Sequence, residues 1–253
     1  MSLPGWLAKG SPLREWTKDG LARSAALGLG TITRVETREP AVALTFDDGP
    51  HPEWTPRFLD VLARGGARGT FFMVGKAARR SPEVAARVVR EGHSAANHSW
   101  DHPSFPLLKG RWRRRQLRWC QEALPAGAAR LFRPPWGHQS PGSRLDAARL
   151  GFRVVTWDVV AEDWGDDDAR TLAERLEAGI RPGSIAVLHD ALFATDDEAH
   201  RDRSAALEAV ALLLERLAGR YRFVTVPELL RLGRPRYWHW YRRSDLEWLQ
   251  KQI

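Results

Sequence analysis

Two adjacent carboxylates stand at the end of a short apolar stretch, in the sequence ALTFDDGPHP at residues 43–52. Asp47 and Asp48 are so close that each disfavours the ionised form of the other, and the pair therefore needs a cation or a proton nearby. Asp-Gly-Pro also forms a good turn, but a turn does not need two acids. The pair predicts a bound cation or a shared proton.

A second cluster, NHSWDHP at residues 97–103, contains two histidines four residues apart. If this segment turns helically, the imidazoles of His98 and His102 point the same way. Two neutral imidazoles and one carboxylate form a common open site for a catalytic divalent metal. A lone histidine pair at this spacing is more often structural, but together with the aspartate pair it favours a metal site. Such ligands accept Zn, Co, Ni, Mn or Fe.

Three further polar clusters follow apolar runs. In LFRPPWG (131–137), Arg133 is permanently charged and can hold a carboxylate with two hydrogen bonds, although a surface arginine beside a rigid turn is the alternative. In WDVVAEDW (157–164), acids share a loop with tryptophans that either cap the core or stack on sugar rings. In IAVLHD (185–190), His189 ends a strand, where a single histidine usually has no special role.

The clusters need a scaffold, and short apolar runs alternate with amphipathic stretches from residue 41 onward. This alternation predicts parallel strands covered by helices. About seven strands favour a closed or nearly closed barrel, whose chemistry gathers at the C-terminal ends of the strands. Strands are predicted at 41–46, 68–75, 94–98, 129–135, 153–160, 184–190 and 222–226. Helices are predicted at 21–32, 55–66, 81–93, 109–124, 143–151, 168–179 and 204–220.

Composition limits the class of protein. The chain has 253 residues, 43% of them hydrophobic, and a single cysteine, which excludes an internal disulfide and a cysteine metal cluster. The net charge of +8 attracts polyanions. Nucleic acid is not an expected partner because the arginines are spread and no recognition motif is present. The run RWRRRQLRW (111–119) is either a solvated helix face or a contact for lipid headgroups or phosphosugars.

The chain shows no apolar segment of 18 residues and no signal-peptide pattern at its start, so a cytoplasmic location is expected. The aromatic and basic stretch at 234–249 suits either a membrane interface or a C-terminal helix that packs on the barrel. We therefore keep peripheral contact with an anionic membrane surface as an alternative. We expect the protein to be a monomer.

The motifs TFDDGP, HSWDH, RPPWG, EDW and IAVLH stand in the order of the five motifs of the polysaccharide deacetylase (NodB-homology) family, carbohydrate esterase family four. The chain resembles this family over residues 40–230. The resemblance implies an α/β fold, a distorted (β/α) barrel of about seven parallel strands. Outside these residues, the sequence predicts a helical extension at 1–39 that packs on the barrel and an aromatic, basic helical tail at 231–253.

The resemblance further implies one divalent metal ion, most often zinc, and a role for each motif residue. Asp47 is the implied base, His189 the acid, Arg133 the residue that holds Asp47, and Asp163 the residue that tunes His189. The backbone N–H of Trp136 is the implied oxyanion donor. The implied metal ligands are Asp48, His98 and His102, and the implied substrate-binding residues are Trp164, Pro134, Ile185 and Val187.

The implied activity is hydrolysis of N-acetyl or O-acetyl groups on a carbohydrate, and the implied substrate is a glycan that contains N-acetylglucosamine. Alternatives are a deformylase or deacetylase of a lipid-linked or small amino sugar, and a non-catalytic carbohydrate-binding relative. One position departs from the family pattern Asp-x-x-Asp-Trp, because Val160 stands where its first aspartate is usual. This departure concerns substrate fit and the tuning of the acid–base groups, for which Asp158 or Glu162 could compensate.

Overall fold

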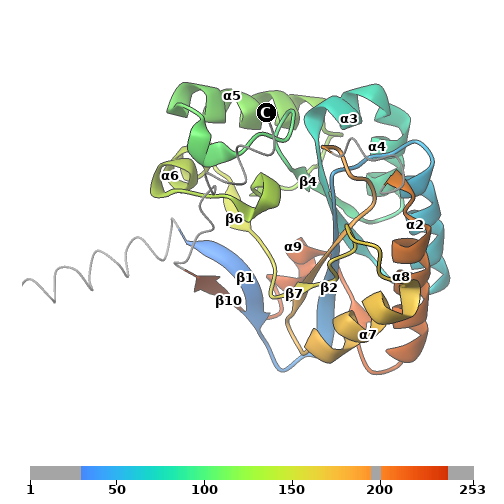
Figure 1. Ribbon diagram of the computed structural model, residues 1–253. Coiled ribbons are helices and arrows are strands. Elements are labelled where there is room, and N and C mark those ends of the chain that lie inside the picture. The colour runs from blue at the N-terminus through green and yellow to red at the C-terminus, as the bar shows by residue number, and fades with distance from the viewer. Residues whose placement is uncertain (1–29, 195–200, 239–253) are drawn as a thin grey trace, which may run out of the picture.

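The computed structural model describes residues 30–194 and 201–238, and within them ten strands form one curved sheet (Figure 1). Its order is β10-β1-β6-β5-β4-β3-β2-β8-β7, with β9 paired to β2. All these pairings are parallel except that of β1 with β10. The strands are β1 (Thr31–Glu36), β2 (Ala41–Asp47), β3 (Gly69–Met73), β4 (Ser94–Asn97), β5 (Leu131–Phe132), β6 (Arg153–Val155), β7 (Val159–Val160), β8 (Ile185–His189), β9 (Arg222–Phe223) and β10 (Arg234–Trp238).

The curled sheet comes round into a distorted barrel through the chain at residues 153–160, helped by an isolated bridge between Arg34 and Ser184. Strands β6 and β7 belong to the predicted strand 153–160, which is interrupted at residues 156–158. Its first part pairs with β5 and its second part with β8, so the ring runs β2-β3-β4-β5-β6 and returns through β7 and β8 to β2. The predicted α/β barrel of parallel strands is therefore confirmed.

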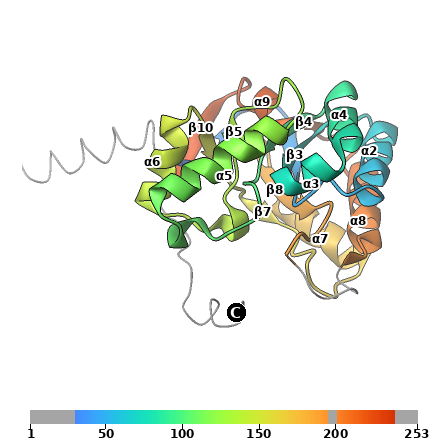
Figure 2. The same cartoon turned by 90° about the horizontal axis from the view of Figure 1, so that it is seen from above.

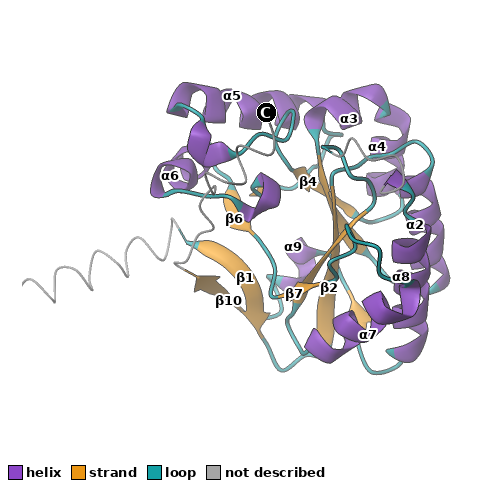
Figure 3. Cartoon of the chain, viewed as in Figure 1, coloured by secondary structure: helices purple, strands orange, loops and turns teal. Residues whose placement is uncertain are grey.

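Helices cover much of the sheet, whereas β1 and β10 lie uncovered at the left, as Figure 3 shows with helices in purple and strands in orange. Helix α5 lies across α3 at one end and α6 at the other, in the view from above of Figure 2. The helices are α2 (Trp54–Arg64), α3 (Gly75–Arg80), α4 (Pro82–Arg90), α5 (Gly110–Ala123), α6 (Pro141–Arg149), α7 (Ala169–Gly179), α8 (Ser204–Arg216) and α9 (Val226–Leu229), with short 3₁₀ turns η2 (Phe105–Leu107) and η3 (Pro135–Gly137).

Strand β2 shows how the sheet separates its two cores. Successive side chains of a strand point to opposite faces. Val42, Leu44 and Phe46 pack in the outer core under the helices, where the Phe46 ring lies 4.8 Å from that of Phe71. Ala41 and Ala43 pack in the barrel interior. Because the alternation continues, Asp47 points to the interior at the rim.

Both predicted helical extensions are wrong where the structure describes them. Within the predicted extension 1–39, residues 31–36 form β1, because its β-branched residues suit a strand and a register shift between Ile32 and Arg34 lets both Ile32 and Val35 pack in the barrel interior. Within the predicted tail 231–253, residues 234–238 form the edge strand β10, a position that tolerates Pro235. Residues 1–29 and 239–253 lie outside the described residues.

Candidate metal centre and active site

The two sequence clusters meet at the rim of the barrel. Asp48 follows β2, while His98 and His102 follow β4, and their ligand atoms all lie within 4.8 Å of one another. Asp48 Oδ1 is 3.3 Å from His98 Nε2 and 3.1 Å from His102 Nε2. The three side chains are buried. The structure thus brings together the predicted ligand set.

The chemistry of these donor atoms fits a divalent ion. Asp48 Oδ1 is buried and has no hydrogen-bond partner, whereas Oδ2 accepts the backbone N–H of Phe193 at 3.0 Å. Burial raises the pKa of Asp48, but the imidazoles of His102 and His98 outweigh this effect and hold it well below its usual range. A carboxylate oxygen that is ionised, buried and unpartnered needs a cation.

The tautomer of His98 is fixed by the backbone just after β5. Its Nδ1–H donates to the backbone carbonyl of Arg133 at 2.8 Å, which leaves Nε2 as the lone-pair nitrogen facing Asp48. The ring of His102 is positioned by an edge contact with Trp136, 4.2 Å between centroids. Both contacts come from the RPPWG motif, so this motif orients both histidines.

Backbone strain in the described chain is concentrated in these motifs. The non-glycine residues with positive φ are Asp48, Ser99, His102, Trp136 and Glu162, at 53–76°. Such conformations cost free energy and persist only where neighbouring contacts enforce them. One enforcing contact is the Ser99 hydroxyl, which accepts the N–H of His102 at 3.0 Å.

Arg133 holds Asp47 from inside the barrel. The guanidinium is fully buried and donates to Asp47 Oδ1 at 2.7 Å. It also donates to the Thr45 hydroxyl at 2.7 Å and to the carbonyl of Thr156 at 2.8 Å, and it lies over the ring of Phe72. Asp47 Oδ2 stays directed toward the metal centre, 4.0 Å from His98 Nε2. The pair leaves one carboxylate oxygen available beside the ligands.

Val160, which stands where the family pattern has an aspartate, lies in line with Thr45 across the strands of the barrel. Val160 is in register with Val187, and Val187 with Thr45, whose hydroxyl meets Arg133. The guanidinium is already satisfied by its other acceptors, so it does not need an aspartate at position 160. Asp158 does not substitute for one, because it binds the start of β8 through the N–H of Ile185 at 2.8 Å.

His189 is held by a buried carboxylate on the other side of the site. Its Nδ1 is 2.9 Å from Asp163 Oδ1, and its N–H donates to Asp163 Oδ2 at 2.8 Å. Burial lowers the pKa of His189, but the charge and hydrogen bond of Asp163 outweigh burial and, with smaller effects of Asp48 and Asp47, raise it to about 9. His189 is therefore a cationic proton donor at neutral pH.

Two buried residues near His189 were missed by the sequence analysis, and one of them, Arg203, supports its partner Asp163. Arg203, buried at the start of α8, donates to the side chain of Asp163 and to its backbone carbonyl at 2.8 Å. Asp190 accepts a hydrogen bond from the hydroxyl of Thr55. It also lies close to Gly49, where an added Cβ would be 2.2 Å from an Asp190 carboxylate oxygen. Burial raises the pKa of Asp190 to about 7. No local sequence signal indicates Arg203, which acts across 40 residues.

The structure places the predicted substrate-binding residues at different depths. Trp164 is 46% exposed, and its ring meets that of His189 edge-on at 5.7 Å. Val187 lies below His189 on the same face of β8, and Ile185 lies two residues deeper, in the interior core with Phe72. Pro134 is buried beside η3. Their roles toward substrate remain predictions, as does that of the Trp136 N–H.

The fold and this site define a class of protein: a metal-dependent hydrolase built at the strand ends of a distorted α/β barrel. Residues 34–155 match the family model described as polysaccharide deacetylase. A chitooligosaccharide deacetylase of Sinorhizobium fredii is 37% identical over 70% of this chain and 86% of its own length. The chain belongs to the polysaccharide deacetylase family, and its predicted membership is confirmed.

Two further comparisons agree with this assignment. A peptidoglycan-N-acetylglucosamine deacetylase of Bacillus cereus is 33% identical over 80% of this chain and 94% of its own length. The crystal structure of a peptidoglycan N-acetylglucosamine deacetylase superposes with a TM-score of 0.72 at 28% identity, covering 81% of this chain and 94% of that one. The predicted enzyme class, a hydrolase acting on carbon–nitrogen bonds other than peptide bonds, is confirmed.

Proposed function

We propose that the chain removes N-acetyl groups from a glycan containing N-acetylglucosamine, with zinc as its ion. The observation that carries this proposal is that Asp47 and His189 are register neighbours on β2 and β8 and flank the ligand set. One is fixed by a buried arginine and the other by a buried aspartate. Such a base and acid beside one ligand set suit hydrolysis of an amide.

Each residue of the site has a separate role in the proposed hydrolysis. Asp48, His98 and His102 would hold the ion, which would supply a Lewis acid for the acetyl carbonyl and lower the pKa of water. Asp47 takes the proton of the attacking water through the oxygen that Arg133 does not occupy. His189 gives the proton of Nε2 to the departing amine, because Asp163 occupies Nδ1. An amine leaves readily only after this proton transfer.

Acetate release from N-acetylglucosamine oligomers tests this proposal, with formylated and O-acetylated sugars as parallel substrates. The protein is stripped of metal and assayed before and after addition of Zn or Co. We expect acetate only with metal, and more from N-acetylglucosamine oligomers than from the other sugars. A metal-loaded protein that releases nothing from the panel would contradict the proposal and favour the non-catalytic alternative.

A cluster of stacked arginine and tryptophan side chains, on α5 and next to it, supports a second proposal, which is peripheral contact with an anionic membrane surface. Arg115 lies between Trp112 and Trp119, at 5.1 and 4.9 Å from their ring centroids. Trp119 meets Trp100 at 6.1 Å, and Arg79 covers Trp100 at 4.6 Å. Trp112 and Trp119 are 39% and 38% exposed. Exposed indoles interleaved with cations suit an anionic headgroup layer.

Sedimentation with phosphatidylglycerol-containing vesicles, compared with phosphatidylcholine alone, tests this contact. We expect binding only to the anionic vesicles, and its loss in the Trp112→Ala/Trp119→Ala variant. The matched control is Arg57→Gln, which removes an arginine stacked on a tryptophan of α2. Equal sedimentation of the Trp112→Ala/Trp119→Ala variant and the unmodified protein would contradict the proposal.

Among the described residues, no helix is both long and apolar enough to cross a bilayer. The cytoplasmic location and the monomeric state remain predictions.

A further inference from the structure

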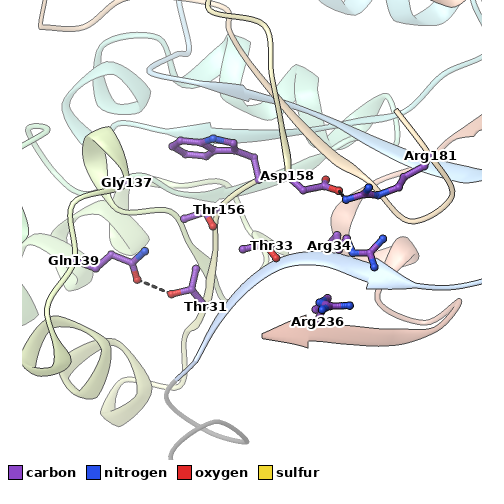
Figure 4. Close-up of a pocket in the computed structure, with 10 residues that line it drawn as sticks. Thr31, Thr33, Arg34, Gly137, Gln139, Thr156, Asp158, Arg181 and Arg236 are labelled. Carbon is purple, nitrogen blue, oxygen red and sulfur yellow. Dashed lines mark hydrogen bonds and ion pairs between the residues drawn. The ribbon is translucent and has the colours of Figure 1, made fainter. Parts of the chain in front are cut away.

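A second cavity, of about 560 Å³, lies between β1, β10, the loop that follows η3 and the chain that joins β6 to β7 (Figure 4). Its walls carry the guanidinium groups of Arg34, Arg181 and Arg236. Trp157 also lines it and contacts the guanidinium of Arg133 at 5.5 Å, so the cavity and the candidate active site share a residue. Cavities of this volume accommodate small ligands.

Two of these arginines face each other across antiparallel strands. Arg34 of β1 is the register partner of Arg236 of β10. Like charges directly opposite in a sheet destabilise it. Arg236 has an ion pair with Glu36 at 3.0 Å, but both side chains are half-exposed and such pairs contribute little. The Arg34 side chain has no hydrogen bond or ion pair to another residue of the described chain.

The one acidic side chain that lines the cavity is already engaged. Asp158 accepts the N–H of Ile185 at 2.8 Å, the hydroxyl of Ser184 at 3.2 Å and the guanidinium of Arg181 at 3.3 Å. Arg181 is thus paired with Asp158 and Arg236 with Glu36, and the third guanidinium, that of Arg34, leaves the cavity electropositive. Positive charge gathered in a concave site attracts an anion.

We propose that this cavity binds an acidic saccharide. Its carboxylate or phosphate would lie between Arg34 and Arg236, because guanidinium groups bind both anions with paired hydrogen bonds. The sugar ring would lie against Trp157, and the hydroxyl of Thr33 would meet ring hydroxyl groups. The ligand neutralises the repulsion that the two arginines otherwise impose on the β1–β10 pair.

Calorimetric titration with D-glucuronate, D-glucose 6-phosphate, D-glucose and inorganic phosphate tests the proposal without any turnover. We expect both acidic sugars to bind, and at least tenfold weaker binding after Arg34→Gln or Arg236→Gln. The control Arg222→Gln removes another exposed strand arginine, paired with Glu39, and should change nothing. Undiminished binding in Arg34→Gln/Arg236→Gln would overturn the site. Inorganic phosphate binding as tightly as D-glucose 6-phosphate would overturn the saccharide.

Thermal unfolding separates a binding role from a structural one. If the arginines repel, Arg34→Gln raises Tm in the absence of ligand, by about 1–3 °C. D-glucuronate should then raise the Tm of the unmodified protein but not that of the variant. A variant that melts lower than the unmodified protein would show that Arg34 stabilises the fold, and would overturn the proposal.

Discussion

Replacement of Asp163 by asparagine tests the assignment of His189 as the proton donor. Asparagine keeps the size of the side chain and an oxygen that can accept the Nδ1–H of His189, but it removes the charge. That charge and its hydrogen bond, at 2.9 Å, are the largest effects that raise the pKa of His189 to about 9. Since burial acts in the opposite direction, the pKa of His189 in the variant should fall to its ordinary value of about 6.5 or below.

The expected loss of activity depends on pH. Only protonated His189 donates, so the rate falls as pH rises through the pKa of this group. At pH 8 a group with a pKa of about 9 is about 90% protonated, and one with a pKa of about 6.5 is about 3% protonated. We therefore expect kcat/KM to fall about 30-fold or more at pH 8. At pH 6 the same change costs less than about twofold if the pKa is about 6.5.

The assay is a profile of kcat/KM for acetate release between pH 5.5 and about 10, measured with saturating metal. The control is Asp167→Asn, in the same loop as Asp163. It removes an exposed carboxylate that pairs with Arg175 of α7, and it should leave the profile unchanged. A descending limb that stays in place in Asp163→Asn would refute the reasoning about His189. An equal loss at every pH would mean that Asp163 only positions the ring.

Four further substitutions address the other roles. Asp48→Ala and His98→Ala should each lose stoichiometric metal, measured by elemental analysis after dialysis, together with activity; full metal occupancy in both would contradict the ligand assignment. Asp47→Asn should keep the metal but lower kcat at least 100-fold, the scale of general base catalysis, and near-normal turnover would point to another base. Trp164→Ala should raise KM for N-acetylglucosamine oligomers several-fold with little effect on kcat, since the exposed indole lies beside His189 and suits contact with a sugar ring. An unchanged KM would remove Trp164 from the substrate site.

The chemical identity of the site could be inferred from the sequence because each motif is local. Asp47 and Asp48 are adjacent, and His98 and His102 are four residues apart, so short segments contain the metal-binding pattern. The alternation of apolar runs with amphipathic stretches likewise predicted parallel strands and their order along the chain. The C-terminal ends of the strands in a parallel barrel share one rim, and this rule predicts that the motifs meet there.

Only the tertiary structure decided which residues support these motifs and that β1 pairs with β10. Arg203 reaches Asp163 across 40 residues, and Thr45 joins Arg133 through a buried hydroxyl. The strands β1 and β10 were predicted as helical segments, because their pairing depends on residues about 200 positions apart. The same pairing places Arg34 opposite Arg236. Local sequence determined the reacting groups of this protein, and long-range packing determined their protonation, their orientation and the cavity beside them.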